Sequence, residues 1–294
     1  MRRIFVSILM VAVVVVAGGA VYVWLSLTGG LDRKRSPERL LALLEPDIEI
    51  VRPDGDGPFP AVLLYHGCEG LWNGDKRRPL MGIYADIARS EGVVAIIVDS
   101  LKPRNIDSAE AYADVCPGWV LRGAERAGDV AVTVPFARSL PYVDPHRIAV
   151  AGWSHGGWTV MDYLAMPPQK LVPYSLTEWP KDAFAGLTSV YLTYPYCGFP
   201  ALAPETGEIE PLPTWAIHGT KDATADPAPC NEAYALMVEE GAPVDVEVID
   251  GATHAFDRPD VLPGSTSVYD PQFAKVAYDR FRAFLRDVLI PSGR

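Results

Sequence analysis

The sequence predicts an α/β protein with a mostly parallel central sheet and helices on both of its faces. Short apolar runs alternate along the chain with segments of helical periodicity, which is the pattern of buried parallel strands joined by crossover helices. The chain has 294 residues, of which 49% are hydrophobic. One large core can therefore form without help from disulfides, and no internal repeat or composition shift marks a second domain.

The individual elements follow from these patterns. Ser36, Pro37 and Glu38 are typical of a helix start, because serine caps the first turn and proline fits its first position. A short helix is expected over residues 39–44. Strands are expected over residues 47–52, 61–65, 93–98, 147–151, 189–194, 214–217 and 244–249. Further helices are expected over residues 79–90, 119–140 (with a kink or an end at Pro135), 155–166, 228–240 and 271–289. Residues 101–118 are expected to form a long loop.

The amino end predicts a membrane-spanning segment. Residues 4–27 contain no ionisable side chain except the phenol of Tyr22, and at about 1.5 Å per residue they could cross a hydrocarbon core of about 30 Å. We expect a transmembrane signal anchor, with a cleaved signal peptide as the alternative, because residues 17–20 offer a site of small residues. The chain then divides into residues 1–30 (anchor or signal peptide), 31–46 (linker and short helix) and 47–294 (catalytic α/β domain).

Net charge excludes one class of partner. The formal charge of the chain is −11, and beyond position 35 there are 21 basic against 36 acidic residues. A domain this acidic repels phosphate backbones, so we expect no nucleic-acid partner. The charges around the apolar segment do not decide its orientation, because Arg2 and Arg3 precede it and a basic trio at 33–35 follows it.

The strongest chemical signal is Gly152-x-Ser154-x-Gly156. It follows an apolar run and precedes a helical segment. A strand that turns sharply into a helix needs small residues on both sides of the turn, and a serine on that turn is exposed above the edge of the sheet. Ser154 is therefore the candidate nucleophile.

A nucleophilic serine needs hydrogen-bond donors for the oxyanion that it creates. One donor is expected to be the backbone N–H of His155, directly after the serine. The other is expected to be the N–H of Cys68, in the loop His66-Gly67-Cys68-Glu69-Gly70 that follows an early strand. We expect His66 itself to order this loop rather than to react.

An acid and a base follow later in the chain. Asp222 comes after the late strand 214–217, where a carboxylate could accept a hydrogen bond from an imidazole and fix its tautomer; Asp226 is the competing acid. His254 follows strand 244–249. The three residues therefore occur along the chain in the order Ser154, Asp222, His254. Enzymes whose nucleophilic serine lies on a strand-to-helix turn have the same order of nucleophile, acid and histidine.

Four cysteines occur in the chain. An even number is consistent with two disulfides in an exported protein, and no Cys-x-x-Cys or Cys/His spacing suggests a metal. Cys68 and Cys116 both lie in loops after early strands, and Cys197 and Cys230 both lie after late ones. We therefore expect the bridges Cys68–Cys116 and Cys197–Cys230 and a periplasmic or other extracytoplasmic location.

The stretch 167–179 is irregular and rich in aromatic residues. It follows the nucleophile helix, so Tyr174 and Trp179 could wall the acyl pocket. Packing of a surface loop on the core is the equally supported alternative. If the stretch does wall the pocket, its shortness favours small or medium acyl groups over long lipids.

The chain resembles the dienelactone hydrolase family of α/β-hydrolases over roughly residues 47–290. The resemblance rests on His66-Gly67-Cys68-Glu69-Gly70, Gly152-Trp153-Ser154-His155-Gly156-Gly157, Gly219-Thr220-Lys221-Asp222 and Gly251-Ala252-Thr253-His254-Ala255-Phe256. It implies the α/β-hydrolase fold, with Ser154 as nucleophile, His254 as base and Asp222 as its orienting acid. One position departs from the family, because the enzymes that name it use a cysteine nucleophile.

The function expected from these features is hydrolysis of a small-molecule carboxylic ester or lactone through an acyl-enzyme, with no cofactor and no metal. The alternatives are a peptidase or an acyltransferase on the same triad, and a binding protein that keeps the fold without turnover. An intact triad argues against the last of these.

Overall fold

The computed structural model describes residues 18–22, 24–25, 33–262 and 264–290. The predicted membrane-spanning segment, residues 4–27, lies mostly outside the described residues. In the part of the chain that is described, no helix is long and apolar enough to cross a membrane.

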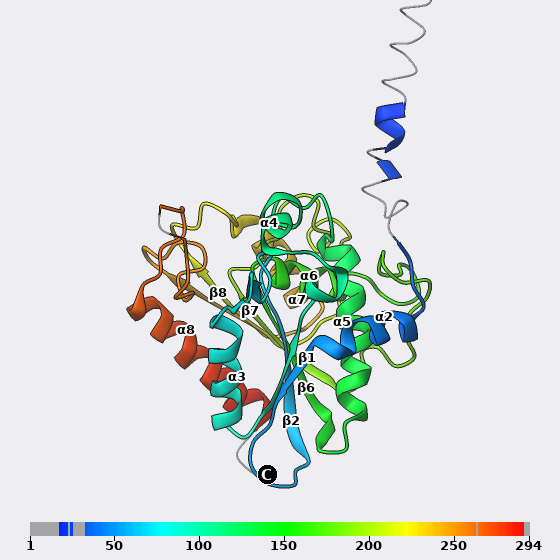
Figure 1. The fold of residues 1–294 in the computed structure, drawn as a ribbon. Helices are drawn as coiled ribbons and strands as arrows, with labels where there is room; N and C mark the ends of the chain where they lie inside the picture. The colour runs from blue at the N-terminus through cyan, green and yellow to red at the C-terminus, as the bar shows by residue number, and fades with distance from the viewer. Residues whose placement is uncertain (1–17, 23, 26–32, 263, 291–294) are drawn as a thin grey trace, which may run out of the picture.

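One seven-stranded sheet forms the centre of the domain (Figure 1). Its strands are β1 (Ile48–Val51), β2 (Phe59–Tyr65), β5 (Val94–Val98), β6 (Val143–Trp153), β7 (Leu187–Thr193), β8 (Thr214–Gly219) and β9 (Val244–Ile249). They lie in the order β1-β5-β2-β6-β7-β8-β9, and only β1 runs antiparallel to its neighbour. The mostly parallel sheet that the sequence predicts is thus present.

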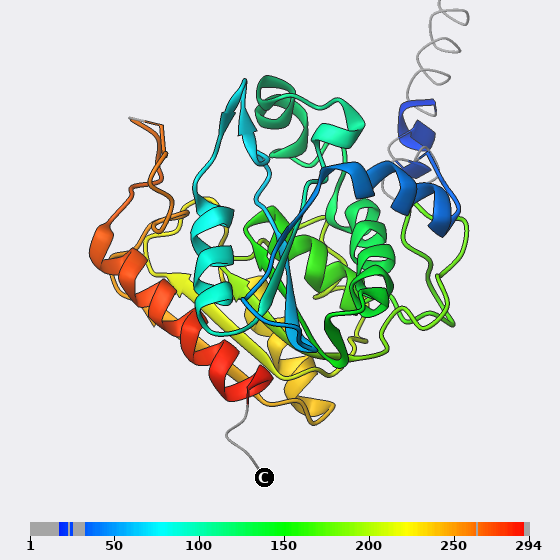
Figure 2. The same cartoon turned by 60° about the horizontal axis from the view of Figure 1, so that its bottom comes forward.

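Helices cover both faces of this sheet. They are α2 (Pro37–Leu44), α3 (Leu80–Ser90), α4 (Ser108–Glu110), α5 (Gly123–Ser139), α6 (His155–Leu164), α7 (Ala228–Glu239) and α8 (Pro271–Phe284). Side chains of α2, α5, α6 and α7 pack in one core cluster, and those of α3 and α8 pack in another. In the ribbon, α3 and α8 lie on one side of the sheet, and α2 and α5 lie on the other (Figures 1 and 2).

Burial on both faces explains why the central strands β2 and β5 are uniformly apolar. In β2, Leu63 points into the core under α5 and α6, whereas its neighbours Val62 and Leu64 point into the core under α3 and α8. All three side chains are fully buried. Because successive side chains of a strand alternate between faces, a strand buried on both sides needs an apolar residue at every position.

The segment after β5 is more structured than the sequence predicts. Residues 101–118, expected to be a loop, contain the 3₁₀ turn η2 (Lys102–Arg104), α4 and the π-helical turn η3 (Ala111–Val115). Asp107 and Glu110 cap α4 reciprocally. Elements of three to five residues are too short to show a helical period in the sequence, although Leu101, Ala111 and Val115 pack in a small apolar cluster.

Three smaller features add detail that the sequence did not predict. Pro135 neither ends its helix nor falls at a boundary, because α5 continues through it to Ser139. A two-stranded hairpin follows β2, formed by β3 (Trp72–Asn73) and β4 (Lys76–Arg77), and no predicted strand covers it. The last predicted helix divides into α8 and the π-helical turn η4 (Leu285–Leu289).

Two disulfides lie outside the sheet, and one of them ends in the first turn of α7. Cys68 is bonded to Cys116 with a Cα separation of 4.9 Å, and Cys197 to Cys230 with a Cα separation of 5.1 Å. These are the pairs that the sequence predicts, and both separations are normal for a disulfide. Disulfides persist in oxidising compartments, so the pair of bridges indicates an extracytoplasmic location.

The topology brings the predicted site residues to one edge of the sheet. The chain passes from β2 to β5 on one side and then to β6 on the other side of β2. Ligands of open α/β sheets bind beside such a reversal, at the carboxyl ends of the strands. The loops after β2, β6, β8 and β9 carry Cys68, Ser154, Asp222 and His254 in turn.

Candidate active site

Ser154 lies on the sharp turn between β6 and α6. Its backbone has φ 52° and ψ −116°, outside the regions that side-chain-bearing residues normally adopt. Strain of this kind persists only where the surrounding structure enforces it. Here the enforcing feature is the close approach of three backbones. A Cβ on Gly152 would lie 2.4 Å from the Gly156 carbonyl oxygen, and one on Gly156 would lie 2.0 Å from the Tyr65 carbonyl oxygen.

A hydrogen-bonded relay runs from Ser154 through His254 to Asp222. His254 Nε2 is 2.8 Å from Ser154 Oγ, and His254 Nδ1 is 2.7 Å from Asp222 Oδ2. Because a carboxylate accepts, Nδ1 carries the proton and donates it to Asp222. Nε2 is then the acceptor for the serine hydroxyl, which is the tautomer that a general base needs.

Asp222 is itself held in place by the backbone. Its Oδ1 accepts hydrogen bonds from the N–H groups of Thr224 and Ala225, each at 2.8 Å. The competing Asp226 instead accepts from the Ala228 N–H at the start of α7 and does not reach His254. Of the two acids that the sequence left open, Asp222 is thus the one that lies within hydrogen-bonding distance of His254.

Behind His254 lies a buried group that the sequence did not reveal. The Tyr194 ring packs against the imidazole with a centroid separation of 4.8 Å. The hydroxyls of Tyr194 and Tyr84 each donate to Asp257 at 2.6 Å. Burial raises the pKa of the Asp257 carboxyl, because its charged form loses hydration. Tyr194 follows a strand end as an ordinary core aromatic would, so the sequence offered no signal for this role.

The two expected oxyanion donors lie beside the serine. Cys68 and His155 line the same cavity as Ser154 and His254. Within the described residues, neither the Cys68 N–H nor the His155 N–H donates a hydrogen bond to another protein group. Burial and the nearby Arg126 hold the pKa of the His155 imidazole well below its usual value, so this side chain is neutral.

The cavity over Ser154 has a volume of about 270 Å³. Aromatic side chains form part of its walls, and its one arginine, Arg258, forms an ion pair with Glu69 at 2.7 Å. The large side chains that line the cavity include Trp158, Tyr194, Tyr196, Tyr112 and Leu262.

The stretch 167–179 does not wall this cavity. The Trp179 ring packs against Tyr163 and Phe184, and its indole N–H donates to the Leu171 carbonyl at 2.7 Å. Tyr174 packs against the core under α5 and α6. The loop-packing alternative is therefore correct, and the aromatic residues of the cavity come from other loops. Among the described residues, no group of three or more His, Cys, Asp or Glu side chains is arranged to hold a metal ion.

The fold and the order of these side chains define an α/β-hydrolase. Residues 48–289 match the model of the dienelactone hydrolase family. The chain therefore belongs to that family, and the resemblance noted from its motifs is confirmed. Membership makes the protein a hydrolase that acts on ester bonds.

Similar proteins are found among sequences and solved structures. The Aquifex aeolicus (strain VF5) protein named "Putative carboxymethylenebutenolidase" is 24% identical over 234 residues, which are 77% of this chain and 89% of that protein. A dienelactone hydrolase-like promiscuous phosphotriesterase from metagenomic libraries superimposes with a TM-score of 0.62 at 17% identity, covering 82% of this chain and 92% of that one. Esterase 2 of Thermogutta terrifontis, phosphorylated by paraoxon, gives a TM-score of 0.60 at 17% identity, with 84% and 90% covered.

The glycine requirement of the turn can be tested directly. Gly156→Ala places a methyl group against the backbone of β2, so we expect the free energy of unfolding to fall by about 3 kcal/mol or more. Gly82→Ala, in α3 where nothing lies within 4 Å of the new methyl group, is the matched control. That variant should gain about 0.5–1 kcal/mol. Urea unfolding followed by circular dichroism gives both values. Equal stability of the two variants would contradict the close packing of the turn.

Proposed function

We propose that the protein is a serine hydrolase that cleaves a carboxylic ester or lactone through a covalent acyl-enzyme. The observation that carries this proposal is the relay in which Ser154 Oγ lies 2.8 Å from His254 Nε2. A serine hydroxyl is a weak nucleophile until a neighbouring base removes its proton. His254 has the geometry and the tautomer for that task.

The reaction proceeds in two halves. Ser154 Oγ attacks the ester carbonyl carbon while His254 Nε2 takes the serine proton, and the imidazolium that forms is stabilised by Asp222. His254 then returns the proton to the departing alcohol oxygen, which leaves the acyl group on Ser154. A water molecule, deprotonated by the same histidine, hydrolyses the acyl-enzyme and releases the carboxylic acid.

The negative charge of each tetrahedral intermediate falls on the former carbonyl oxygen. The free N–H groups of Cys68 and His155 are the donors proposed for this oxygen. His155 is also the first residue of α6, so its N–H belongs to the positive end of the helix dipole. Preorganised donors of this kind supply a large part of the rate enhancement in acyl transfer.

The serine at the nucleophile position affects which substrate class is proposed. The name-giving enzymes of the family use a thiolate, which is nucleophilic near neutral pH without strong base activation. Ser154 instead depends on its base throughout. Carboxylic esters and lactones in general are therefore the proposed substrates, rather than a dienelactone in particular.

Substitutions within the relay test the mechanism. Ser154→Ala should lower kcat for a p-nitrophenyl ester by about 10⁴-fold or more, because the covalent route is lost. Asp222→Asn should lower kcat by about 10²- to 10⁴-fold, because the wrong tautomer of His254 becomes favoured. Asp226→Asn, which keeps a side-chain oxygen to accept from the Ala228 N–H, serves as the control and should stay within about threefold of the wild-type kcat.

Two results would refute this assignment. One is near-normal ester hydrolysis by a folded Ser154→Ala variant. The other is a ranking in which Asp226→Asn is more harmful than Asp222→Asn, which would make Asp226 the orienting acid. Circular dichroism and thermal melts establish beforehand that each variant is folded.

The acyl group is proposed to be uncharged and of small or medium size. The cavity volume of about 270 Å³ is at the lower end for ligand sites. The Glu69–Arg258 ion pair leaves no uncompensated positive charge in the wall for a substrate carboxylate. In a p-nitrophenyl ester series, kcat/KM should peak between the acetyl and hexanoyl esters. A steady rise to long-chain esters would refute the size limit while leaving the esterase assignment intact.

We also propose that the domain is anchored at the outer face of a membrane through residues 4–27. The disulfides favour export, and the described residues Val21, Tyr22 and Trp24 of this segment are exposed by more than half. In a bacterial host, a C-terminal alkaline phosphatase fusion of the full chain should be active and should sediment with membranes. Fluorescence from a reporter that folds only in the cytoplasm would contradict export, and a soluble periplasmic fusion would indicate a cleaved signal peptide.

A further inference from the structure

The side chain of Arg126 is fully buried in α5, yet it forms no ion pair with any described residue. Its donors go to neutral acceptors instead. Nε donates to Ser100 Oγ at 2.8 Å, and Nη1 lies 2.9 Å from the His66 carbonyl oxygen and 3.3 Å from His155 Nδ1. Burial lowers the pKa of this guanidinium to about 10, and its Nη2 has no hydrogen-bond partner. A buried, unpaired arginine costs free energy, and residues that break such a rule tend to lie at functional sites.

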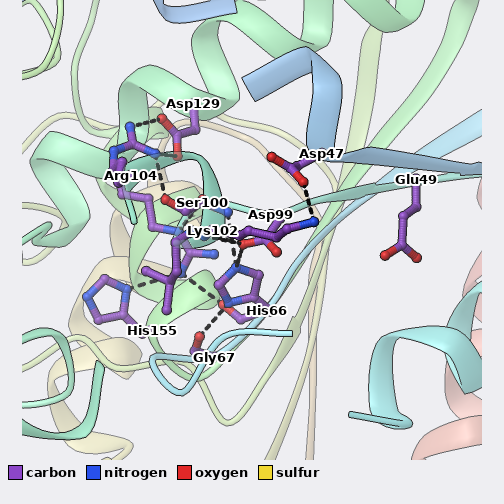
Figure 3. A network of polar contacts seen from close by, with 12 residues as sticks. Asp47, Glu49, His66, Gly67, Asp99, Ser100, Lys102, Arg104, Asp129 and His155 are labelled. Carbon is purple, nitrogen blue, oxygen red and sulfur yellow. Dashed lines mark hydrogen bonds and ion pairs between the residues drawn. The ribbon is translucent and has the colours of Figure 1, made fainter. Parts of the chain in front are cut away.

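The groups that Arg126 contacts come from three loops at the active-site edge of the sheet. His66 follows β2, Ser100 follows β5, and His155 follows Ser154 at the start of α6 (Figure 3). One guanidinium thus joins the loop that carries one proposed oxyanion donor to the residue that carries the other. Arg126 itself does not line the cavity over Ser154.

The hydrogen bonds of the His66 ring fix the orientation of the Cys68 N–H. The Ser100 N–H donates to His66 Nε2 at 3.2 Å, so the ring proton lies on Nδ1, which donates to the Gly67 carbonyl oxygen at 2.6 Å (Figure 3). This carbonyl and the Cys68 N–H belong to one peptide unit. Because a trans peptide is planar, its carbonyl and its N–H point in opposite directions. Fixing the carbonyl on His66 therefore aims the Cys68 N–H away from His66.

The His155 side is held in a similar way. An arginine N–H can only donate, so His155 Nδ1 is an acceptor and carries no proton. This contact fixes the side chain of the residue whose own N–H is the second donor. The guanidinium also contacts both the His66 carbonyl and the His155 ring, so its positive charge lies close enough to favour a negative charge at this site.

We propose that Arg126 is a positioning residue of the oxyanion hole, which sets the Cys68 and His155 N–H groups by holding His66, Ser100 and His155 together. The inference rests on the proposed serine-hydrolase function. Arg126 touches no substrate, and it acts only through the groups that it holds. Its contribution is expected in the transition state, where the oxyanion forms, and not in the binding of the uncharged ester.

Arg104 provides a matched control within the same network. It is nearly buried, forms an ion pair with Asp129 at 2.6 Å and donates to the Ser100 carbonyl oxygen at 2.7 Å (Figure 3). It contacts neither His66 nor His155. Replacing Arg104 therefore disturbs the polar network and the stability without releasing either oxyanion donor.

The test compares Arg126→Met, Arg126→Lys and Arg104→Met in the full chain. For a short-chain p-nitrophenyl ester, Arg126→Met should lower kcat by about 10²-fold with KM within threefold, since the loss of one oxyanion donor costs about 10²- to 10³-fold. The inhibition constant of a trifluoromethyl ketone, which forms a tetrahedral adduct on the serine, should rise by the same factor as kcat falls. Arg126→Lys keeps the charge and one donor, so kcat should fall about tenfold. Arg104→Met should keep kcat within twofold, even where its melting temperature drops.

The kinetic results of these variants either support or overturn the role proposed for Arg126. If Arg126→Met does not fold, the Lys variant supplies the decisive comparison. The proposal is overturned if kcat of the folded Arg126 variant stays within twofold, if KM rises as much as kcat falls, or if Arg104→Met loses kcat equally. It is also overturned if the inhibition constant of the ketone does not move with kcat. Failure of the proposed function is recognised separately, because the wild-type protein would then neither hydrolyse esters nor be inactivated by paraoxon.

Discussion

The approach of α6 to the ends of β2 and β6 is the constraint on which the site depends. Only a glycine at position 156 leaves room for the Tyr65 carbonyl oxygen, and only a glycine at 152 leaves room for the Gly156 carbonyl. The chain must then turn through Ser154 in a strained conformation that lifts the hydroxyl above the sheet. The same approach sets His155 beside the loop after β2, so the proposed nucleophile and the proposed oxyanion donors are both positioned by the packing of α6.

Polar groups that would be costly elsewhere are concentrated around this turn. Three buried side chains here are ionisable: His66, His155 and Asp257. Burial lowers the pKa of each histidine and raises the pKa of the aspartate, so the neutral form of each group is favoured. Arg126 remains charged without a paired carboxylate. The two apolar cores on either side of the sheet, together with the disulfides, offset these costs. One disulfide also ends in Cys68, so the oxyanion loop is held covalently from outside and by hydrogen bonds from within.

The sequence predicts those parts of the molecule that follow from local rules. Uniform apolar runs identify strands buried on both faces, and the glycines around Ser154 identify the turn. The chain order of Asp222 and His254 places them on neighbouring strand ends, where the structure indeed has them within hydrogen-bonding distance. The disulfide pairs follow because loops after neighbouring strands meet at one edge.

Other features depend on packing between distant segments, which no local pattern records. Trp179 resembles a pocket residue in the sequence but packs on Tyr163, 16 positions away. Arg126 resembles a solvated helix residue, and only the folded chain shows that it is buried beneath His66. Tyr194 becomes part of the site because β7 ends beside β8, which brings it against the His254 ring.

Trapping the acyl-enzyme tests the central claim most directly. The full-length protein is mixed with a p-nitrophenyl butyrate excess, quenched in acid within milliseconds and examined by intact-mass and peptide mass spectrometry. The account predicts a mass gain of one butyryl group on the wild-type protein, located on the peptide that contains Ser154, and no such gain on Ser154→Ala. A butyryl group on any other residue, or rapid turnover with no acylated protein at any quench time, would contradict it.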